Sequence, residues 1–360
     1  MNHFTAVRVQ LEKRGLDALL ITSEANRFYA SAFHTTGADD AVVVVTRKDN
    51  YLITDSRYTE AARAQLKNAR LVIRENAAGY PDLIRKIFEE DSVTKAGFED
   101  GALTVREFNT YRDGLKCEFV PASELFQELR QSKDEDEIRS MKAAQKIADK
   151  ALTQLLDELR LGMTELEISA RLQYLMLLGG AERMSFDPIV ASGPNSSMPH
   201  AVPTDRKIQD GDFLTIDFGC VSEGYCSDTT RTVAIGHATE EMRKVYNTVL
   251  EAQLAGIAKA RTGVIGKEVH EAAHNVIRAA GYGEYFGHGY GHSLGLEIHE
   301  PPYFNSRNDK PMPDCAAVSA EPGIYLPGKF GVRIEDVVIL HEDGCEDITG
   351  LPKDLRIIPV

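Results

Sequence analysis

The chain has 360 residues, of which 43% are hydrophobic, so it is long enough to form two domains with sizeable cores. Its formal net charge of −14 argues against nucleic acid or an anionic membrane as the main partner. Five scattered cysteines without a CxxC pair do not indicate a disulfide framework, and no apolar stretch reaches membrane-spanning length, so we expect a cytoplasmic protein.

Residues 1–122 alternate between short apolar runs and helical patterns, which is typical of an α/β domain. The first helix is expected over residues 4–14 and ends at Gly15. Strands are predicted at residues 18–22, 41–46, 51–54, 71–74, 96–98 and 117–121. Further helices are predicted at residues 57–66, 82–88 and 105–115. No cluster of catalytic residue types occurs in this region, and we expect the lone His34 to be structural.

The second predicted domain spans residues 123–360 and opens with a charged helix start at residues 132–138. Acidic residues suit the first turn of a helix, because the helix dipole favours negative charge there. This helix is expected to end near Leu159. Thr164 and Glu167 then form a capping box, which predicts a second helix to about residue 178.

The same order of elements recurs later in the chain. Helices are predicted at residues 239–260 and 267–280, and the stretches LGMTELEIS and TGVIGKEVH align at an offset of 101 residues. This offset carries Asp217 to position 318, close to Glu321. The second domain is therefore predicted to contain two similar halves, each with two helices and a β-hairpin, and a shared site should lie between the halves.

Residues 212–234 predict the first of these hairpins, with an apolar run on each side of a turn. If the turn centres between Ser222 and Glu223, Asp217 and Asp228 lie directly opposite each other. Facing carboxylates have Cβ atoms about 5 Å apart and repel each other. A divalent cation would neutralise the pair. In the alternative interpretation, one aspartate points to solvent or pairs with Arg231.

Residues 318–340 predict the second hairpin, with a turn at Pro327-Gly328 that places Glu321 opposite Glu335. Between the hairpins, the stretch GHGYGHSLGLEIHE contains three histidines. Four carboxylates and an imidazole form an oxygen-rich ligand set. Such a set is typical of a site for two Mn²⁺, Co²⁺ or Zn²⁺ ions rather than of a thiolate zinc site.

The ordered motifs IDFG, SDTTRT, GHSLGLEIHE, EPGIY and RIED, preceded by His200, resemble those of the pita-bread metallopeptidases. This family includes methionine aminopeptidase, aminopeptidase P and prolidase. The resemblance covers about residues 122–352, and the α/β N-terminal domain extends it to the branch of aminopeptidase P, prolidase and creatinase. It implies an α+β fold, in which a pita-bread catalytic domain of two pseudo-symmetric halves follows a creatinase-like N-terminal domain.

The resemblance also implies two divalent metal ions, taken here as Mn²⁺ with Co²⁺ or Zn²⁺ as alternatives. Five residues of this sequence match the ligand positions, namely Asp217, Asp228, His292, Glu321 and Glu335. In this assignment Asp228 and Glu335 bridge both ions. Glu321 both binds an ion and transfers the catalytic proton.

The remaining implied site residues act on the substrate or beside the metals. His200 and His299 would contact the substrate and stabilise the tetrahedral intermediate, and His288 would play a supporting role. Arg333 and Tyr325 would form a hydrogen-bonded pair next to the metal ions. Since methionine aminopeptidases lack that arginine, Arg333 favours the proline-directed branch.

The implied substrate is a peptide with proline at position 2, from which the N-terminal residue is released. Some prolidases carry an arginine just after the second histidine motif, where it binds the carboxylate of a dipeptide, whereas Tyr303 lies near that position here. The sequence therefore favours an Xaa-Pro aminopeptidase, with an Xaa-Pro dipeptidase as the alternative. The complete ligand set argues against creatinase and against a non-catalytic peptide-binding module, and the family suggests a homodimer.

Overall fold

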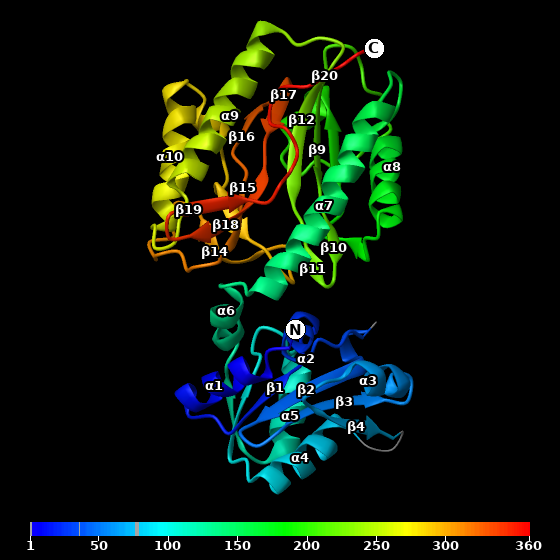
Figure 1. Cartoon of the computed structure of the whole chain (residues 1–360), viewed down its shortest axis with the longest axis vertical. Helices are drawn as coiled ribbons and strands as arrows, with labels where there is room; N and C mark the ends of the chain where they lie inside the picture. Colours follow the sequence, from blue (N-terminus) through cyan, green and yellow to red (C-terminus); the bar gives the residue numbers. More distant parts are fainter. Residues whose placement is uncertain (1, 36, 76–78) are drawn as a thin grey trace. The chain divides into compact units, whose positions relative to one another are not determined.

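The computed structural model describes residues 2–35, 37–75 and 79–360. The chain forms two compact units, Met1–Arg130 and Gln131–Val360 (Figure 1). The division falls after helix α6 (Glu124–Arg130), later than the boundary expected at residue 122. Helix α6 belongs to the first unit because its buried Phe126 packs edge-on against Tyr29, with ring centroids 6.2 Å apart.

The N-terminal unit is built on a six-stranded mixed sheet with the order β4-β3-β2-β1-β5-β6. Its strands are β1 (Ala18–Ile21), β2 (Ala41–Thr46), β3 (Asn50–Asp55), β4 (Arg70–Arg74), β5 (Lys95–Phe98) and β6 (Glu118–Pro121). Its other helices are α1 (Phe4–Arg14), α2 (Glu24–Ser31), α3 (Thr59–Gln65), α4 (Tyr80–Asp91) and α5 (Val105–Leu115). The predicted α/β alternation is confirmed, although the short helices α2 and α6 were not predicted.

Two helix pairs organise the C-terminal unit. They are α7 (Glu135–Glu158) with α8 (Glu165–Leu178), and α9 (Glu240–Lys259) with α10 (Gly266–Ala279). Helices α8 and α10 begin at positions that share the offset of the two aligned sequence motifs, and the predicted capping box of Thr164 and Glu167 is present. The two pairs pack onto separate apolar cores, so the predicted two-halved arrangement is confirmed.

The strands of this unit lie between the two helix pairs (Figure 1). One sheet has the order β20-β12-β9-β8 and a second has the order β14-β13-β15-β18-β19. The first comprises β8 (Ile189–Ser192), β9 (Phe213–Phe218), β12 (Thr229–Ile235) and β20 (Ile357–Ile358). The second comprises β13 (Gly291–Ser293), β14 (Glu300–Phe304), β15 (Ala317–Ala320), β18 (Asp336–His341) and β19 (Gly344–Asp347). Smaller sheets contain β16 (Gly323–Leu326) with β17 (Phe330–Arg333), and β7 (Arg183–Met184) with β10 (Cys220–Ser222) and β11 (Tyr225–Cys226).

The register of the first hairpin differs from the prediction. Asp217 pairs with Thr230, and Asp228 lies two residues before that partner. The turn is centred one residue later than predicted, because Glu223 and Gly224 both adopt positive φ angles, of 50° and 80°. The two aspartates therefore share a face as diagonal neighbours and do not lie directly opposite each other.

The register of the second hairpin agrees with the prediction. Ala320 pairs with Asp336 on one side of the glutamates, and Gly323 pairs with Arg333 on the other side. Gly328, with a φ of 72°, occupies the predicted turn. Glu321 and Glu335 consequently face each other at the break between strands β15 and β16 and between β17 and β18.

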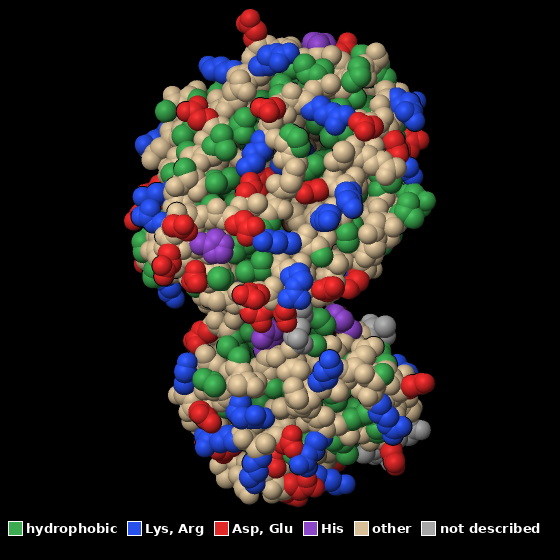
Figure 2. All heavy atoms as spheres, in the orientation of Figure 1, with side chains coloured by type: hydrophobic (Ala, Val, Ile, Leu, Met, Phe, Trp, Pro, Cys, Tyr) green, Lys and Arg blue, Asp and Glu red, His purple; other side chains and the backbone are tan. Residues whose placement is uncertain are grey.

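Charged side chains of both signs are intermixed over the face of the molecule shown in Figure 2, without a continuous basic surface. This distribution agrees with the acidic composition of the chain. Within residues 2–35, 37–75 and 79–360, no helix is both long enough and apolar enough to cross a membrane.

Candidate metal centre

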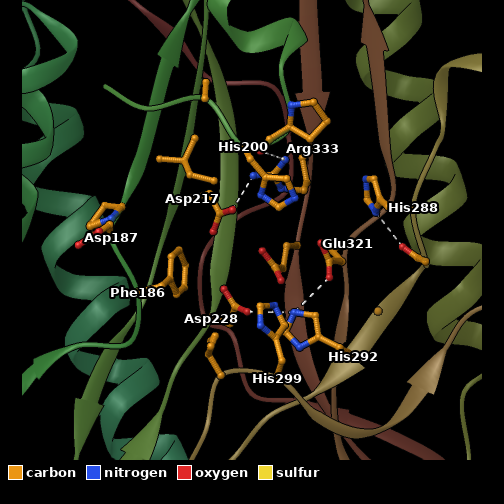
Figure 3. Close-up of a pocket in the computed structure, with 18 of the residues that line it drawn as sticks. Phe186, Asp187, His200, Asp217, Asp228, His288, His292, His299, Glu321 and Arg333 are labelled. Atoms are coloured by element: carbon orange, nitrogen blue, oxygen red, sulfur yellow. Dashed lines mark hydrogen bonds and ion pairs between the residues drawn. The ribbon is translucent and has the colours of Figure 1, made fainter. Parts of the chain in front are cut away.

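A cavity of about 560 Å³ in the C-terminal unit collects the predicted site residues. Side chains from both hairpins and from the histidine-rich stretch between them point into it (Figure 3). Its lining includes the ten residues that the resemblance assigned to metal binding, to catalysis or to a supporting role, namely His200, Asp217, Asp228, His288, His292, His299, Glu321, Tyr325, Arg333 and Glu335. The folded chain thus brings together residues that are more than a hundred positions apart.

Asp217, on strand β9, is held from one side by an arginine. Arg333 on β17 donates from Nη2 to Asp217 Oδ2 at 2.5 Å, and both side chains are largely buried. The other oxygen, Asp217 Oδ1, is buried and has no hydrogen-bond partner among the described residues. A buried carboxylate oxygen without a partner costs free energy, so its position indicates a ligand atom for a cation.

Asp228, His292, Glu321 and Glu335 converge on the same point. His292 Nε2 lies 3.5 Å from Asp228 Oδ2 and 3.3 Å from Glu321 Oε1. One ligand atom each of Asp228, His292 and Glu335 lies within 4.8 Å of the others. These separations exceed the roughly 2.7–2.9 Å of a direct charge-assisted hydrogen bond. They suit donor atoms arranged around a shared cation.

The electrostatics of the cavity favour bound cations. Burial and the neighbouring carboxylates raise the pKa of Asp228 and of Glu335 well above their usual values. Burial also raises the pKa of Glu321, and it lowers the pKa of His292, so the imidazole is neutral and able to act as a ligand. Divalent cations would neutralise the carboxylates and remove the repulsion between them. The residues present therefore fit a divalent metal centre.

Two hydroxyl residues position the ligands and were missed in the sequence. Thr230 Oγ1 donates to Glu335 Oε2 at 2.7 Å and accepts from Arg333 Nε at 3.0 Å. Ser319 Oγ donates to Glu321 Oε1 at 3.1 Å. Each hydroxyl residue lies two positions from a ligand on the same strand or its extension, so the period-2 alternation of a strand was the signal that could have revealed it.

Tyr325 connects the arginine to a histidine. Its hydroxyl accepts from Arg333 Nη1 at 2.8 Å and lies 3.0 Å from His288 Nε2. The Tyr325–Arg333 pair expected from the resemblance is present beside Asp217. Burial raises the pKa of Tyr325 to about 12, so the phenol stays protonated and can donate to His288.

The histidines expected to face the substrate lie on the cavity wall. The rings of His292 and His299 meet edge-on, with centroids 4.4 Å apart. Burial and the neighbouring His292 lower the pKa of His299, so this imidazole is neutral near pH 7 and retains one N–H to donate. His200 follows the 3₁₀ turn η2 (Gly193–Ser197) and enters the same cavity.

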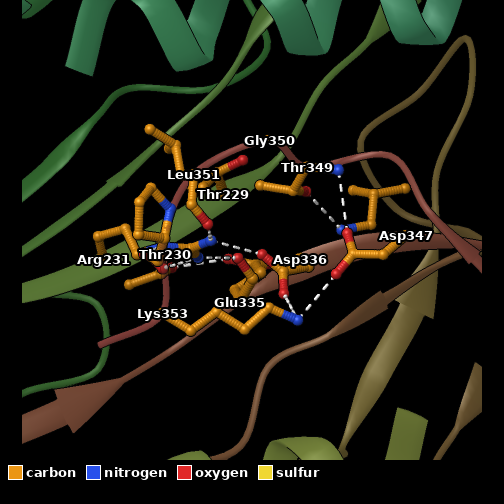
Figure 4. A network of polar contacts seen from close by, with 12 residues as sticks. Thr229, Thr230, Arg231, Glu335, Asp336, Asp347, Thr349, Gly350, Leu351 and Lys353 are labelled. Carbon is orange, nitrogen blue, oxygen red and sulfur yellow. Dashed lines mark hydrogen bonds and ion pairs between the residues drawn. The ribbon is translucent and has the colours of Figure 1, made fainter. Parts of the chain in front are cut away.

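Arg231 pairs with neither aspartate of the first hairpin, so that alternative interpretation is wrong. It donates instead to Asp336 Oδ1 at 2.7 Å and to the backbone carbonyl of Glu335 at 2.6 Å (Figure 4). Lys353 forms a second ion pair with this residue, with its Nζ 2.5 Å from Asp336 Oδ2. Burial opposes ionisation of Asp336, but Arg231 and Lys353 outweigh it and lower the pKa of this carboxyl. This buried network holds the backbone next to Glu335.

Comparisons with known proteins identify the family of the chain. Residues 139–342 match metallopeptidase family M24, and residues 4–132 match the creatinase/prolidase N-terminal domain. An Xaa-Pro dipeptidase of Pyrococcus horikoshii is 39% identical, over 96% of each chain. The structure of an Xaa-Pro dipeptidase from Bacillus anthracis superposes with a TM-score of 0.94 at 41% identity, covering 98% of each chain.

The structure of an X-Pro aminopeptidase from Thermotoga maritima is nearly as similar. Its TM-score is 0.91 at 37% identity, covering 97% of this chain and all of the other. The predicted resemblance to the pita-bread peptidases is confirmed by these matches. The chain therefore belongs to metallopeptidase family M24 and carries a creatinase/prolidase N-terminal domain.

Proposed function

We propose that this protein is a dimetal exopeptidase that hydrolyses the bond between an N-terminal residue and proline. The observation that carries the proposal is the convergence of four carboxylates and His292 on one cavity, with Asp217 Oδ1 buried and unpartnered. The ligands would be Asp217, Asp228, His292, Glu321 and Glu335, with Asp228 and Glu335 shared between two ions. When bound, two divalent cations supply a hydroxide nucleophile at neutral pH and polarise the scissile carbonyl.

The protein residues supply the proton transfer. Desolvation raises the pKa of Glu321, so its carboxylate is suited to accept the proton of the attacking water and return it to the departing nitrogen. Ser319 holds one of its oxygens in place. The return of this proton matters for proline, because the tertiary amide nitrogen must be protonated before the bond breaks.

The histidines act on the carbonyl. A neutral His299 would donate its N–H to the oxygen that becomes negative in the tetrahedral intermediate, and His200 would contact the substrate beside it. Apolar side chains on the cavity wall, including Phe186, Ile189 and Ile298, offer surface for the proline ring and the preceding side chain.

The cavity favours an aminopeptidase that accepts peptides longer than two residues. Arg333 is the one arginine or lysine that lines the cavity within the described part of the chain, and it is committed to Asp217 and Tyr325. Tyr303 lines the cavity and carries no charge with which to bind a dipeptide carboxylate. A dipeptidase is the second candidate, because the Pyrococcus and Bacillus relatives bear that name.

The deciding assay compares three substrates under saturating Mn²⁺: an Xaa-Pro dipeptide, an Xaa-Pro-Xaa tripeptide and the matching Xaa-Ala-Xaa tripeptide. Cleavage of both proline peptides, with the tripeptide preferred, supports the proposal. Preference for the dipeptide would select the dipeptidase. Equal cleavage of the alanine peptide would contradict proline specificity.

Three finer features belong to the same proposal. Manganese is proposed as the native metal because hard oxygen ligands predominate in the site. A homodimer is proposed from the family resemblance, and sedimentation of the purified protein tests it. A cytoplasmic location fits the five free cysteines.

A further inference from the structure

A second group of ligand side chains lies outside the cavity. One ligand atom each of Asp314, Cys315 and His341 lies within 4.8 Å of the other two. Cys315 Sγ is 3.6 Å from Asp314 Oδ2. None of the three residues lines the cavity of the metal centre. The group therefore combines a thiol, an imidazole and a carboxylate at a place for which the peptidase reaction has no use.

The backbone at Cys315 is strained. Its φ is 54°, in the left-handed region that favours glycine. Cys315 donates its N–H to the carbonyl of Leu340, while the N–H of Leu340 donates to the carbonyl of Ala316. Two residues of one strand thus face one residue of the other, as in a β-bulge whose left-handed position is normally glycine. A cysteine at this position costs stability, which indicates a role for its side chain.

Thr262 connects His341 to Asp314, the neighbour of Cys315. Thr262 donates its N–H to the carbonyl of His341 at 2.9 Å, and its Oγ1 donates to Asp314 Oδ1 at 2.9 Å. Cys315 and His341 are both half-buried, while Asp314 is exposed. The arrangement is anchored on its backbone side and open to solvent on the other, so that an ion can enter.

The ligand chemistry selects the class of ion. Zn²⁺ binds Cys, His and Asp with bonds of about 2.0–2.3 Å in a tetrahedron, which places ligand atoms roughly 3.5 Å apart. The three ligand atoms lie within 4.8 Å of one another, which is close to that spacing. A thiolate ligand favours zinc-like ions over the Mg²⁺, Ca²⁺ and Mn²⁺ that prefer oxygen. Three protein ligands leave a fourth position for water.

We propose that Asp314, Cys315 and His341 form a binding site for one thiophilic divalent cation of the Zn²⁺ class, separate from the peptidase centre. On binding, the sulfur–hydrogen bond of Cys315 breaks, the proton leaves to solvent, and the thiolate forms the bond to the cation without any change of oxidation state. Burial and the neighbouring Asp314 raise the pKa of the Cys315 thiol, so the proton stays on sulfur until a cation replaces it.

A cation bound at this site should stabilise the neighbouring strands. Cys315 lies two residues before the start of β15, and His341 is the last residue of β18, so a cation would tie together the adjacent ends of two paired strands. A cation that binds only the folded chain raises its free energy of unfolding by mass action, by an amount set by its concentration relative to the dissociation constant.

The test is a titration of the full-length, Mn²⁺-loaded protein with Cd²⁺ as the probe. The peptidase centre has no sulfur ligand among its lining residues, so thiolate-to-Cd²⁺ charge-transfer absorption in the ultraviolet reports on a cysteine site alone. We expect one equivalent of Cd²⁺ to produce this absorption in the wild type. Absence of the absorption in the wild type would overturn the proposal.

Variants separate Cys315 from the other thiols. Cys315→Gly should fold well, because glycine relieves the left-handed strain, and it should lose the absorption completely. Cys345→Ser is the matched control, since Cys345 is also half-buried but belongs to no ligand group among the described residues, and it should keep the absorption. Persistence of the absorption in Cys315→Gly would contradict the assignment.

Two further variants test the thiolate and the imidazole separately. Cys315→Ser keeps the size of the side chain and removes the thiolate, so it should also lose the absorption even if the glycine variant folds poorly. His341→Ala removes one of three chelating groups and should weaken Cd²⁺ binding by about tenfold or more. Unchanged affinity in His341→Ala would mean that the histidine is not a ligand and would overturn the three-residue site.

Discussion

Arg333 binds Asp217 through one carboxylate oxygen and leaves the other oxygen buried without a partner among the described residues. The arginine therefore orients the aspartate and also selects which oxygen faces the cavity. The buried acid is thereby held by a cation in a cavity that also contains three other carboxylates. This arrangement predicts that the protein depends on its metal ions for stability as well as for catalysis.

Removal of the metal ions should lower the melting temperature of the wild type. Four carboxylates that line one cavity repel one another in the empty site. Ions that bind only the folded form stabilise it by about 3–4 kcal/mol at 100–1,000 times the dissociation constant. Thermal denaturation with and without a chelator measures this effect. The shift should shrink in Asp228→Asn, and an unchanged wild-type melt after verified metal removal would be evidence against the structural role.

The ligand and substrate-facing roles can be separated by two substitutions. Glu335→Gln should lose both bound metal and activity, because it removes a carboxylate proposed to bridge the ions. His299→Ala should keep the metal and lose roughly 10²–10³-fold in turnover, the range for one donor to a developing oxyanion. Metal analysis together with steady-state kinetics makes the comparison. A metal-free His299→Ala protein would show that the ligand histidine has been misassigned.

Asp336→Asn should strongly destabilise the C-terminal unit. The substitution leaves Arg231 buried with a weaker partner, and breaking a buried ion pair by removing one partner costs about 3–5 kcal/mol. Lys142→Met is the matched control, since it breaks an exposed pair with Glu346 that contributes only about 0–1 kcal/mol. Urea denaturation midpoints report both effects, and similar losses in the two variants would contradict the importance of the buried network.

The contact between helices α7 and α8 should respond to acid through Glu158. Arg171 binds both of its carboxylate oxygens at 2.6 and 2.7 Å, and hydrogen bonds from Arg171 and Gln154 lower the pKa of Glu158 to about 2. A carboxyl group whose pKa is lowered on folding stabilises the protein at pH values above its pKa in the unfolded state. This stabilisation is lost as the pH falls through its pKa in the folded state. Glu158→Gln should therefore be less stable than the wild type near pH 7, and this difference should shrink below pH 4.5. Melting temperatures across this range test it, and a difference independent of pH would exclude the ion pair as its cause.

Much of this protein could be predicted from local sequence. Helix starts at Thr164 and Asp134 follow from capping residues that contact the backbone three positions later, and apolar periodicity reports the buried face of each element. The turn at Gly328 fixed the register of the second hairpin, and with it the facing pair of Glu321 and Glu335. All of these signals depend on neighbours only a few residues apart in the chain.

Other features were decided by contacts between distant segments. The first hairpin turns at Glu223-Gly224, and a shift of one residue in that turn moves Asp228 from opposite Asp217 to a diagonal position. The sequence could not tell which arginine pairs with which acid, since Arg333 and Arg231 reach their partners from separate strands. Likewise, Cys315 and His341 meet through the bulge just before the start of β15. Pairing across sheets is governed by burial and packing of the whole unit, so only the tertiary structure brings these side chains into contact.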